Sequence, residues 1–121
     1  MKIAIPVKTN KENPPVAPLF GKAKWFAFVE NGNVTIEQNM AKGGQAVIGW
    51  LAKENVNAII FQEMGTAPYE LIKAQGGIKL YHSGYERILL DDLLQKFSDN
   101  ALTELDDAKM AEIIGHHESK H

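Results

Sequence analysis

The fold is decided by residues 57–81, which read NAIIFQEMGTAPYELIKAQGGIKLY. The first six residues of this stretch are mostly apolar, as in a buried strand. Residues 65–68 open a segment with helical spacing, and the glycines at 76–77 supply the left-handed cap that ends such a helix. The last four residues read as another strand. This order predicts two parallel strands joined by a right-handed crossover.

Toward the N-terminus, the sequence predicts three further strands and a proline-rich loop. Residues 2–8 are a short β-branched run, and residues 10–18 contain the prolines of a loop. Residues 24–30 and 34–38 flank Asn31-Gly32-Asn33, a strong hairpin signal. The hairpin adds antiparallel strands to one edge of the parallel portion.

Two more helices complete the pattern. One follows the glycines at 43–44 and carries Val47, Trp50 and Leu51 at helical spacing. The other carries leucines and Phe97 at spacings of three and four between residues 90 and 97, which is a clear apolar stripe. The order βββαβαβα predicts an α/β fold with a mixed five-stranded sheet and helices on both faces.

Residues 98–121 differ from the rest and are predicted to be a helical extension of a domain that spans residues 1–97. The extension holds six acidic residues against two lysines. Its apolar residues indicate a weakly amphipathic helix that ends at Gly115; they are Leu102, Leu105, Met110, Ile113 and Ile114.

Composition excludes several classes of protein. The chain has 121 residues and no cysteine, so a disulfide scaffold, a thiolate zinc finger and a Cys-ligated iron–sulfur cluster are ruled out. A net charge of −2 gives no global reason to bind nucleic acid or an anionic membrane. The N-terminus reads as a strand and not as a signal peptide, so we expect a soluble cytoplasmic protein without a membrane span.

Loops that follow parallel strands converge at one edge of a sheet, where backbone N–H groups at helix starts favour anions. We therefore expect an anion-binding site there, unless the glycines serve only turns and tight packing. Glu63 counts against an anion unless it faces solvent. The expected site residues are Lys8, Thr9, Lys42, Gly43, Gly44, Gly65, Thr66, His82, Ser83 and Gly84.

Catalysis is not expected. Ser83, His82 and Asp91 offer a hydrolytic triad on paper, but adjacent Ser and His side chains cannot easily point at each other. The strands predicted at residues 2–8, 57–62 and 78–81 lack the interior carboxylates that a two-metal nuclease needs.

Three of the four histidines lie in the last six residues. His117 and His121 are four apart and would share a helix face, so with His116 they are predicted to bind a divalent metal. The alternative is a solvated tail or an expression-tag remnant.

Five stretches resemble the dinitrogenase iron–molybdenum cofactor biosynthesis family, of the NifX and NifB C-terminal type. They occur in family order and are residues 1–7, 16–23, 56–60, 64–69 and 77–81. The resemblance implies a ribonuclease H-like α/β fold. It also places Phe20, Gly21 and Gly65 at the family's binding site, although Leu19 stands where many members have His.

The resemblance further implies a non-catalytic carrier in metallocofactor biosynthesis. Such a carrier holds an iron–sulfur or molybdenum-containing cluster, or its precursor, and passes it to a partner protein of the same pathway. The alternative is an interaction or regulatory module that binds no cluster and docks through its acidic tail. The oligomeric state is left open.

Overall fold

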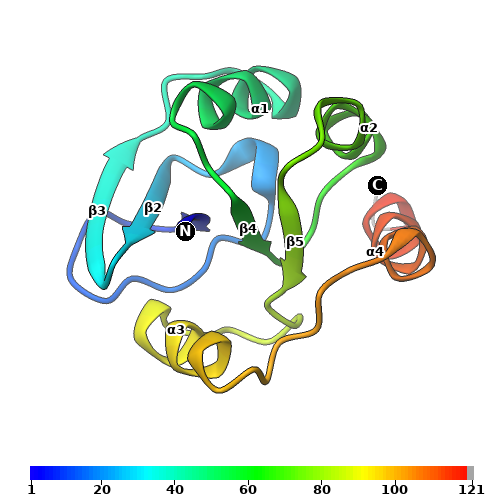
Figure 1. Cartoon of the computed structure of the whole chain (residues 1–121). Helices are drawn as coiled ribbons and strands as arrows, with labels where there is room; N and C mark the ends of the chain where they lie inside the picture. The colour runs from blue at the N-terminus through cyan, green and yellow to red at the C-terminus, as the bar shows by residue number, and fades with distance from the viewer. Residues whose placement is uncertain (120–121) are drawn as a thin grey trace.

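The computed structural model describes residues 1–119 and contains one five-stranded sheet in the order β3-β2-β1-β4-β5 (Figure 1). The central strand β1 pairs antiparallel with β2 and parallel with β4, while β2–β3 is antiparallel and β4–β5 is parallel. The predicted mixed sheet is therefore confirmed. The strands are β1 Lys2–Val7, β2 Trp25–Glu30, β3 Asn33–Gln38, β4 Ala58–Phe61 and β5 Lys79–His82.

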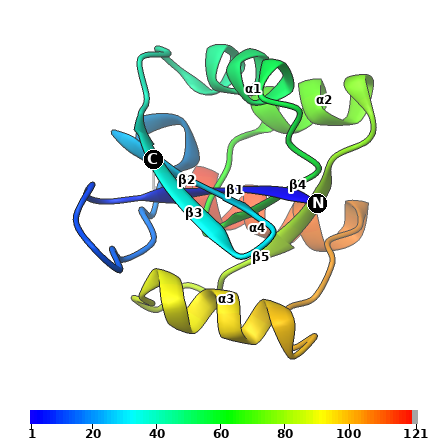
Figure 2. The same ribbon diagram turned by 60° about the vertical axis from the view of Figure 1, so that its left-hand side comes forward.

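Helices cover both faces of the sheet. Figure 2 shows α1 and α2 on one face and α3 on the other, and Figure 1 shows α4 beside α2 at the β5 edge. A single 3-10 turn, η1, precedes β2. The helical elements are η1 Phe20–Lys22, α1 Gly44–Lys53, α2 Thr66–Gln75, α3 Leu90–Ser98 and α4 Asp107–Ser119.

The sheet divides the core into two layers. In β1, Ala4 packs in the layer under α1 and α2, whereas Ile3 and Ile5 pack in the layer under α3. Successive strand residues point to opposite faces, so a strand buried on both faces must be apolar throughout. This explains why the central strands are continuous apolar runs and not alternating ones.

The predicted hairpin turn forms between β2 and β3. Asn31 and Gly32 adopt positive φ values of 52° and 80°. Positive φ at both central residues is the geometry of a type I′ turn, whose twist matches that of the flanking strands. Phe26 and Phe28 are buried in the core layer under α1 and α2, where Trp50 packs against them. Trp25 is partly buried in the opposite layer, under α3.

The C-terminal helix differs from its prediction at both ends. It begins at Asp107 and continues through Gly115 to Ser119. Leu105 lies before the helix because its backbone N–H donates to the Leu80 carbonyl of β5, at 2.8 Å. Met110 and Ile113 are buried in the core layer that α2 and β4 share, so the helix is packed against the domain.

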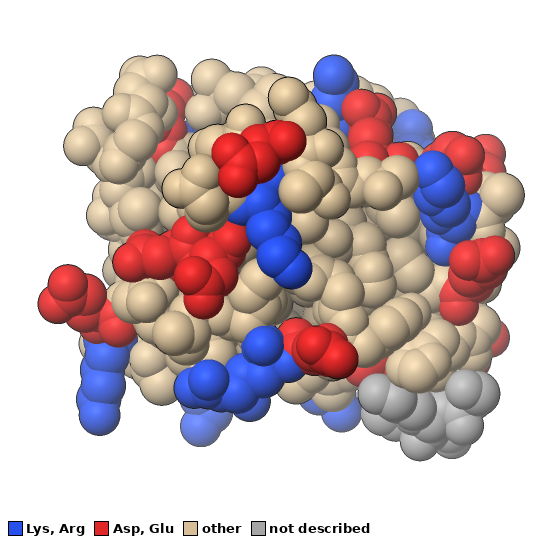
Figure 3. All heavy atoms as spheres, turned by 90° about the horizontal axis from the view of Figure 1, so that it is seen from below, with Lys and Arg blue, Asp and Glu red and all other residues tan. Residues whose placement is uncertain are grey.

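The surface bears charges of both signs. On the face seen in Figure 3, Lys and Arg side chains are interspersed with Asp and Glu. None of the helices within residues 1–119 has both the length and the apolar character that a membrane crossing requires.

Candidate functional site

The site begins where the proline-rich loop returns to the sheet. The backbone N–H of Phe20 donates to the Glu63 carbonyl, and the N–H of Glu63 donates to the Pro18 carbonyl, both at 3.1 Å. Leu19 therefore pairs in parallel with Glu63, directly beyond the end of β4. This pairing sets η1 beside the loop that leads into α2.

A cavity of about 450 Å³ opens at this junction, within the usual range for a small-ligand site. It lies at the carboxyl end of β4, where a parallel sheet places its ligands. Three loops and the C-terminal helix surround it. The lining residues are Leu19, Phe20, Gly21, Lys22, Gly43, Gly44, Glu63, Met64, Gly65, Pro68, His117 and Glu118.

Two of the lining glycines are required by close packing. A Cβ on Gly21 would lie 3.1 Å from the Gly44 backbone nitrogen, and a Cβ on Gly44 would lie 2.8 Å from Cγ of Pro68. Side chains at either position would push η1, α1 and α2 apart. The glycines thus hold the three elements together around the cavity.

Helices α1 and α2 both begin at the cavity. Their N-caps are Gly43 and Gly65, and no side chain among the described residues caps either helix. The first N–H groups of a helix lack intrahelical partners and carry partial positive charge. Two such ends meeting at one cavity favour a ligand with electronegative atoms.

The side chains of the cavity bear both signs of charge. The Glu63 side chain is 2% exposed, so it does not face solvent. By the expectation from the sequence, a buried Glu63 counts against a simple anion as the ligand. Its Oε1 lies 3.9 Å from His117 Nδ1 and 4.0 Å from His116 Nε2. Glu118 accepts a hydrogen bond from Thr66 Oγ1 at 3.1 Å, and Lys22 also lines the cavity. Carboxylates beside an imidazole suit a metal-containing ligand better than a simple anion.

The structure does not bring all the predicted segments into one cavity. Gly43, Gly44 and Gly65 line the cavity at β4, with Lys42 and Thr66 adjacent to them in sequence. Lys8 and Thr9 do not line this cavity. They also do not line a second cavity, which lies at the end of β5 and is described below. The Lys8 N–H instead donates to the Pro15 carbonyl at 2.9 Å, so the chain turns there into the proline-rich loop.

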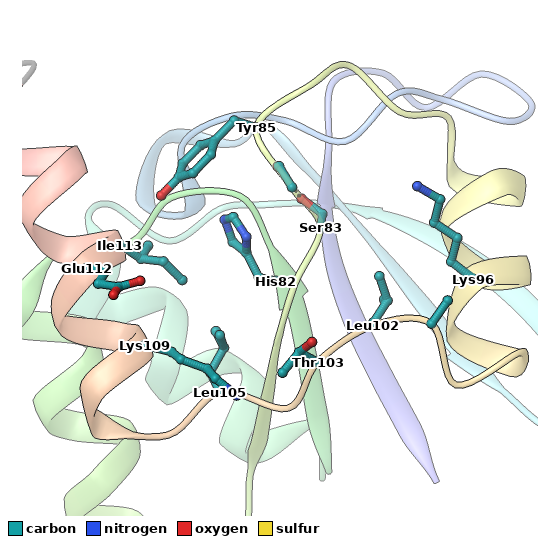
Figure 4. A pocket seen from close by; sticks show the side chains of 12 residues that line it. His82, Ser83, Tyr85, Lys96, Leu102, Thr103, Leu105, Lys109, Glu112 and Ile113 are labelled. Atoms are coloured by element: carbon teal, nitrogen blue, oxygen red, sulfur yellow. Dashed lines mark hydrogen bonds between the residues drawn. The ribbon is translucent and has the colours of Figure 1, made fainter.

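His82, Ser83 and Gly84 line a second cavity of about 490 Å³, between β5, α3 and α4 (Figure 4). They are separated from the first cavity because the chain leaves β5 toward α3, on the opposite face of the sheet from α1 and α2. Figure 4 shows Lys96 and Lys109 on different walls of this second cavity.

His82 and Ser83 do not form a catalytic pair. His82 Nε2 donates to the Gln62 carbonyl at 2.8 Å, while Ser83 Oγ donates to the Gly84 carbonyl at 3.2 Å. Burial lowers the pKa of His82, which favours the neutral ring. Burial also raises the pKa of the neighbouring Tyr85 phenol, whose ring lies 4.7 Å from that of His82.

The predicted tail metal site is only partly within the described structure. His116 and His117 lie beside Glu63, and His121 lies outside the described residues. Within residues 1–119, no group of three His, Asp or Glu side chains is arranged to hold a metal ion alone. The binding of a divalent metal at His116, His117 and His121 stays a prediction.

The sequence matches the family described as "Dinitrogenase iron-molybdenum cofactor" over residues 1–100. It is also 34% identical, over 112 residues, to an uncharacterised protein of Methanocaldococcus jannaschii, a match that covers 84% of this chain and 89% of that one. The chain belongs to the dinitrogenase iron–molybdenum cofactor family. Phe20, Gly21 and Gly65, which the family resemblance marks, all line the cavity at β4.

Solved structures agree with this assignment. A Thermotoga protein provisionally assigned as NifB is 26% identical with a TM-score of 0.71, over 86% of this chain and 92% of that one. The apo form of the orange protein from Desulfovibrio gigas has a TM-score of 0.75 at 20% identity, over the same shares of the two chains, and shows the shared fold alone.

The family match ends before α4. His117 and Glu118, which the sequence did not predict as part of this cavity, therefore come from beyond the matched residues 1–100. Glu63 and Met64 were also not among the residues that the sequence predicted for the site. A Glu directly after a buried apolar strand is the signal that marks the Glu63 loop, because an acidic side chain is seldom buried there without a role.

Proposed function

We propose that this protein is a non-catalytic carrier in metallocofactor biosynthesis, acting in the cytoplasm. It binds an iron–sulfur or molybdenum-containing cluster, or a precursor, in the cavity at β4 and passes it to a partner protein of the same pathway. The observation that carries this proposal is the convergence of two uncapped helix N-termini on a cavity lined by metal-ligating side chains, in a member of this family.

The chemistry of the lining supports a cluster as the ligand. Backbone N–H groups at the starts of α1 and α2 favour the electronegative sulfide or oxide atoms of a cluster. Phe20, Met64 and Pro68 provide an apolar wall, and Met64 is 1% exposed. Glu63 and His117 suit its metal ions. A simple anion would be stabilised by the backbone N–H groups but not by the Glu63 carboxylate.

The absence of cysteine supports transfer of the cluster and not permanent storage. Thiolates bind the iron of clusters tightly, and this chain has none. Backbone dipoles, an imidazole and carboxylates bind more weakly, so the cluster remains available to a partner that has stronger ligands.

Docking through the acidic tail without a cluster is less well supported. Met110 is fully buried and Ile113 is 5% exposed, so the apolar face of α4 packs against its own domain and is not available to a partner. The same helix lines the cavity through His117 and Glu118. Both observations favour a role for α4 at the ligand site.

The proposal is tested by reconstitution with molybdate, iron and sulfide, followed by gel filtration, metal analysis and visible absorption. We expect wild type to retain colour and metal. The variant Gly65→Leu should fill the cavity and weaken binding at least about tenfold, because Gly65 has extended backbone, with φ −83°, that accepts a side chain.

Gly49→Leu is the matched control, since Gly49 lies on α1 with nothing within 4 Å of its Cβ position. It should bind as wild type does. A wild-type protein that stays colourless and metal-free, or a Gly65→Leu variant that loads normally, would overturn the proposal.

A further inference from the structure

Helix α4 closes the cavity at β4, and both of its ends are anchored. At its start, Asp107 accepts a hydrogen bond from the Tyr69 hydroxyl and lies 3.3 Å from Lys73 Nζ. Near its end, Glu118 accepts the hydrogen bond from Thr66 at the start of α2. The position of the last helical turn over the cavity is therefore fixed by contacts with α2.

This anchoring places the His117 ring above the loop that forms the floor of the cavity. A Cβ on Gly65 would lie 3.6 Å from His117 Nε2, an ordinary contact distance, so the imidazole packs directly over Gly65. The other ring nitrogen, Nδ1, faces the Glu63 carboxylate at 3.9 Å. The His117 side chain is 25% exposed, which leaves the ring accessible to a ligand in the cavity.

Imidazole is a good ligand for iron, copper, zinc and nickel, and metal-binding imidazoles commonly have a carboxylate on the side of the second ring nitrogen. Lys22 cannot act in this way because an ammonium group has no lone pair. His117 is thus the strongest nitrogen ligand among the described side chains of the cavity.

We propose that His117 binds a metal ion of the carried cluster directly, with the Glu63 carboxylate facing its other ring nitrogen. This inference rests on the proposed function and names the side-chain ligand of that site. Residues 1–119 hold no group of three His, Asp or Glu side chains suited to a lone ion. The metal ions of a cluster are already bridged by its own sulfide, so a single imidazole can add a ligand to one of them.

His116 provides a matched control on the same helix. Its Nε2 lies 4.0 Å from the same Glu63 oxygen, but its ring packs on Tyr85, with ring centroids 4.2 Å apart. His116 does not line the cavity at β4. Loss of either imidazole removes the same chemical group beside Glu63, yet of the two only His117 lines the cavity.

The test reconstitutes wild type, His117→Ala and His116→Ala with molybdate, iron and sulfide, and measures binding and metal X-ray absorption. We expect wild type and His116→Ala to show outer-shell scattering from an imidazole. His117→Ala should lack that scattering and bind at least about tenfold more weakly. Free imidazole should restore binding to His117→Ala, which a merely structural role would not allow.

The outcomes separate the two proposals. Wild type that binds no cluster contradicts the proposed function, and this inference with it. Equal loading of wild type and His117→Ala overturns this inference alone. So does an equal loss of imidazole scattering in His117→Ala and His116→Ala. If His117→Ala binds weakly and free imidazole does not rescue it, the direct ligand role is also overturned.

Discussion

At Gly44, the lack of a side chain allows α1 to begin against Pro68 in the first turn of α2. The Cβ of any other residue would lie 2.8 Å from the Pro68 ring, closer than real Cβ contacts, and the ring cannot rotate away. Gly49, five residues later in the same helix, faces open space. Close packing therefore requires glycine at position 44 but not at position 49.

We expect Gly44→Ala to lower the free energy of unfolding by about 1–3 kcal/mol, because overpacking must displace α1 or α2. Gly49→Ala should raise it by up to about 1 kcal/mol, since alanine favours the helix. Urea denaturation measures both. Equal effects of the same sign in the two variants would contradict the packing argument.

Tyr69 links α2 to α4 through its hydroxyl. Burial and the hydrogen bond to the Asp107 carboxylate raise the pKa of the phenol to about 12 from its ordinary value of 10.0. The same hydrogen bond, together with Lys73, lowers the pKa of Asp107. The pair is therefore held with Tyr69 protonated and Asp107 ionised.

Because the Tyr69 pKa is higher in the folded state, its contribution to stability is complete below pH 10 and is lost as the pH rises through about 12. We expect the phenolate absorbance at high pH to show a component with a midpoint near 12 that is missing in Tyr69→Phe. A variant that retains this component would show that the assignment to Tyr69 is wrong.

At the scale of the element, α4 is held by a small apolar face and by polar contacts at both ends. Met110 is fully buried and Ile113 nearly so, while most of the other side chains of the helix are exposed or partly exposed. Most helical stability in proteins comes from packing of such a face. Loss of Met110 should therefore loosen the helix that carries His117.

We expect Met110→Ala to reduce the free energy of unfolding by about 2–5 kcal/mol through lost burial and a cavity. The neighbouring exposed Lys109→Ala should change it by less than about 0.5 kcal/mol. Thermal or urea unfolding measures both. Similar small effects would mean that α4 is not part of the cooperative core.

At the scale of the whole molecule, most of the fold was predictable from local pattern. The apolar runs of β1 and β4, the Asn31-Gly32 turn and the glycines after α2 each specify one element through short-range physics. The extent of α4 was not predictable, because the hydrogen bond from Leu105 to Leu80 depends on residues far apart in the sequence.

The candidate site was predictable from the sequence in its glycines and, through the family resemblance, at Phe20. Gly43, Gly44 and Gly65 sit in loops whose meeting follows from the sheet topology. The separation of His82 from these loops depends on which face the next helix covers, and the entry of His117 depends on how α4 packs. Neither is encoded in local sequence spacing.

The pairing of residues 104–105 with β5 also determines how this sheet meets other chains. Leu105 donates to Leu80, and Glu104 bridges to Tyr81, so part of the β5 edge is occupied by the chain itself. An unpaired strand edge is a template for aggregation. At the opposite edge, the exposed strand β3 carries polar residues and Glu37. Both edges are thereby less available for pairing with strands of other chains.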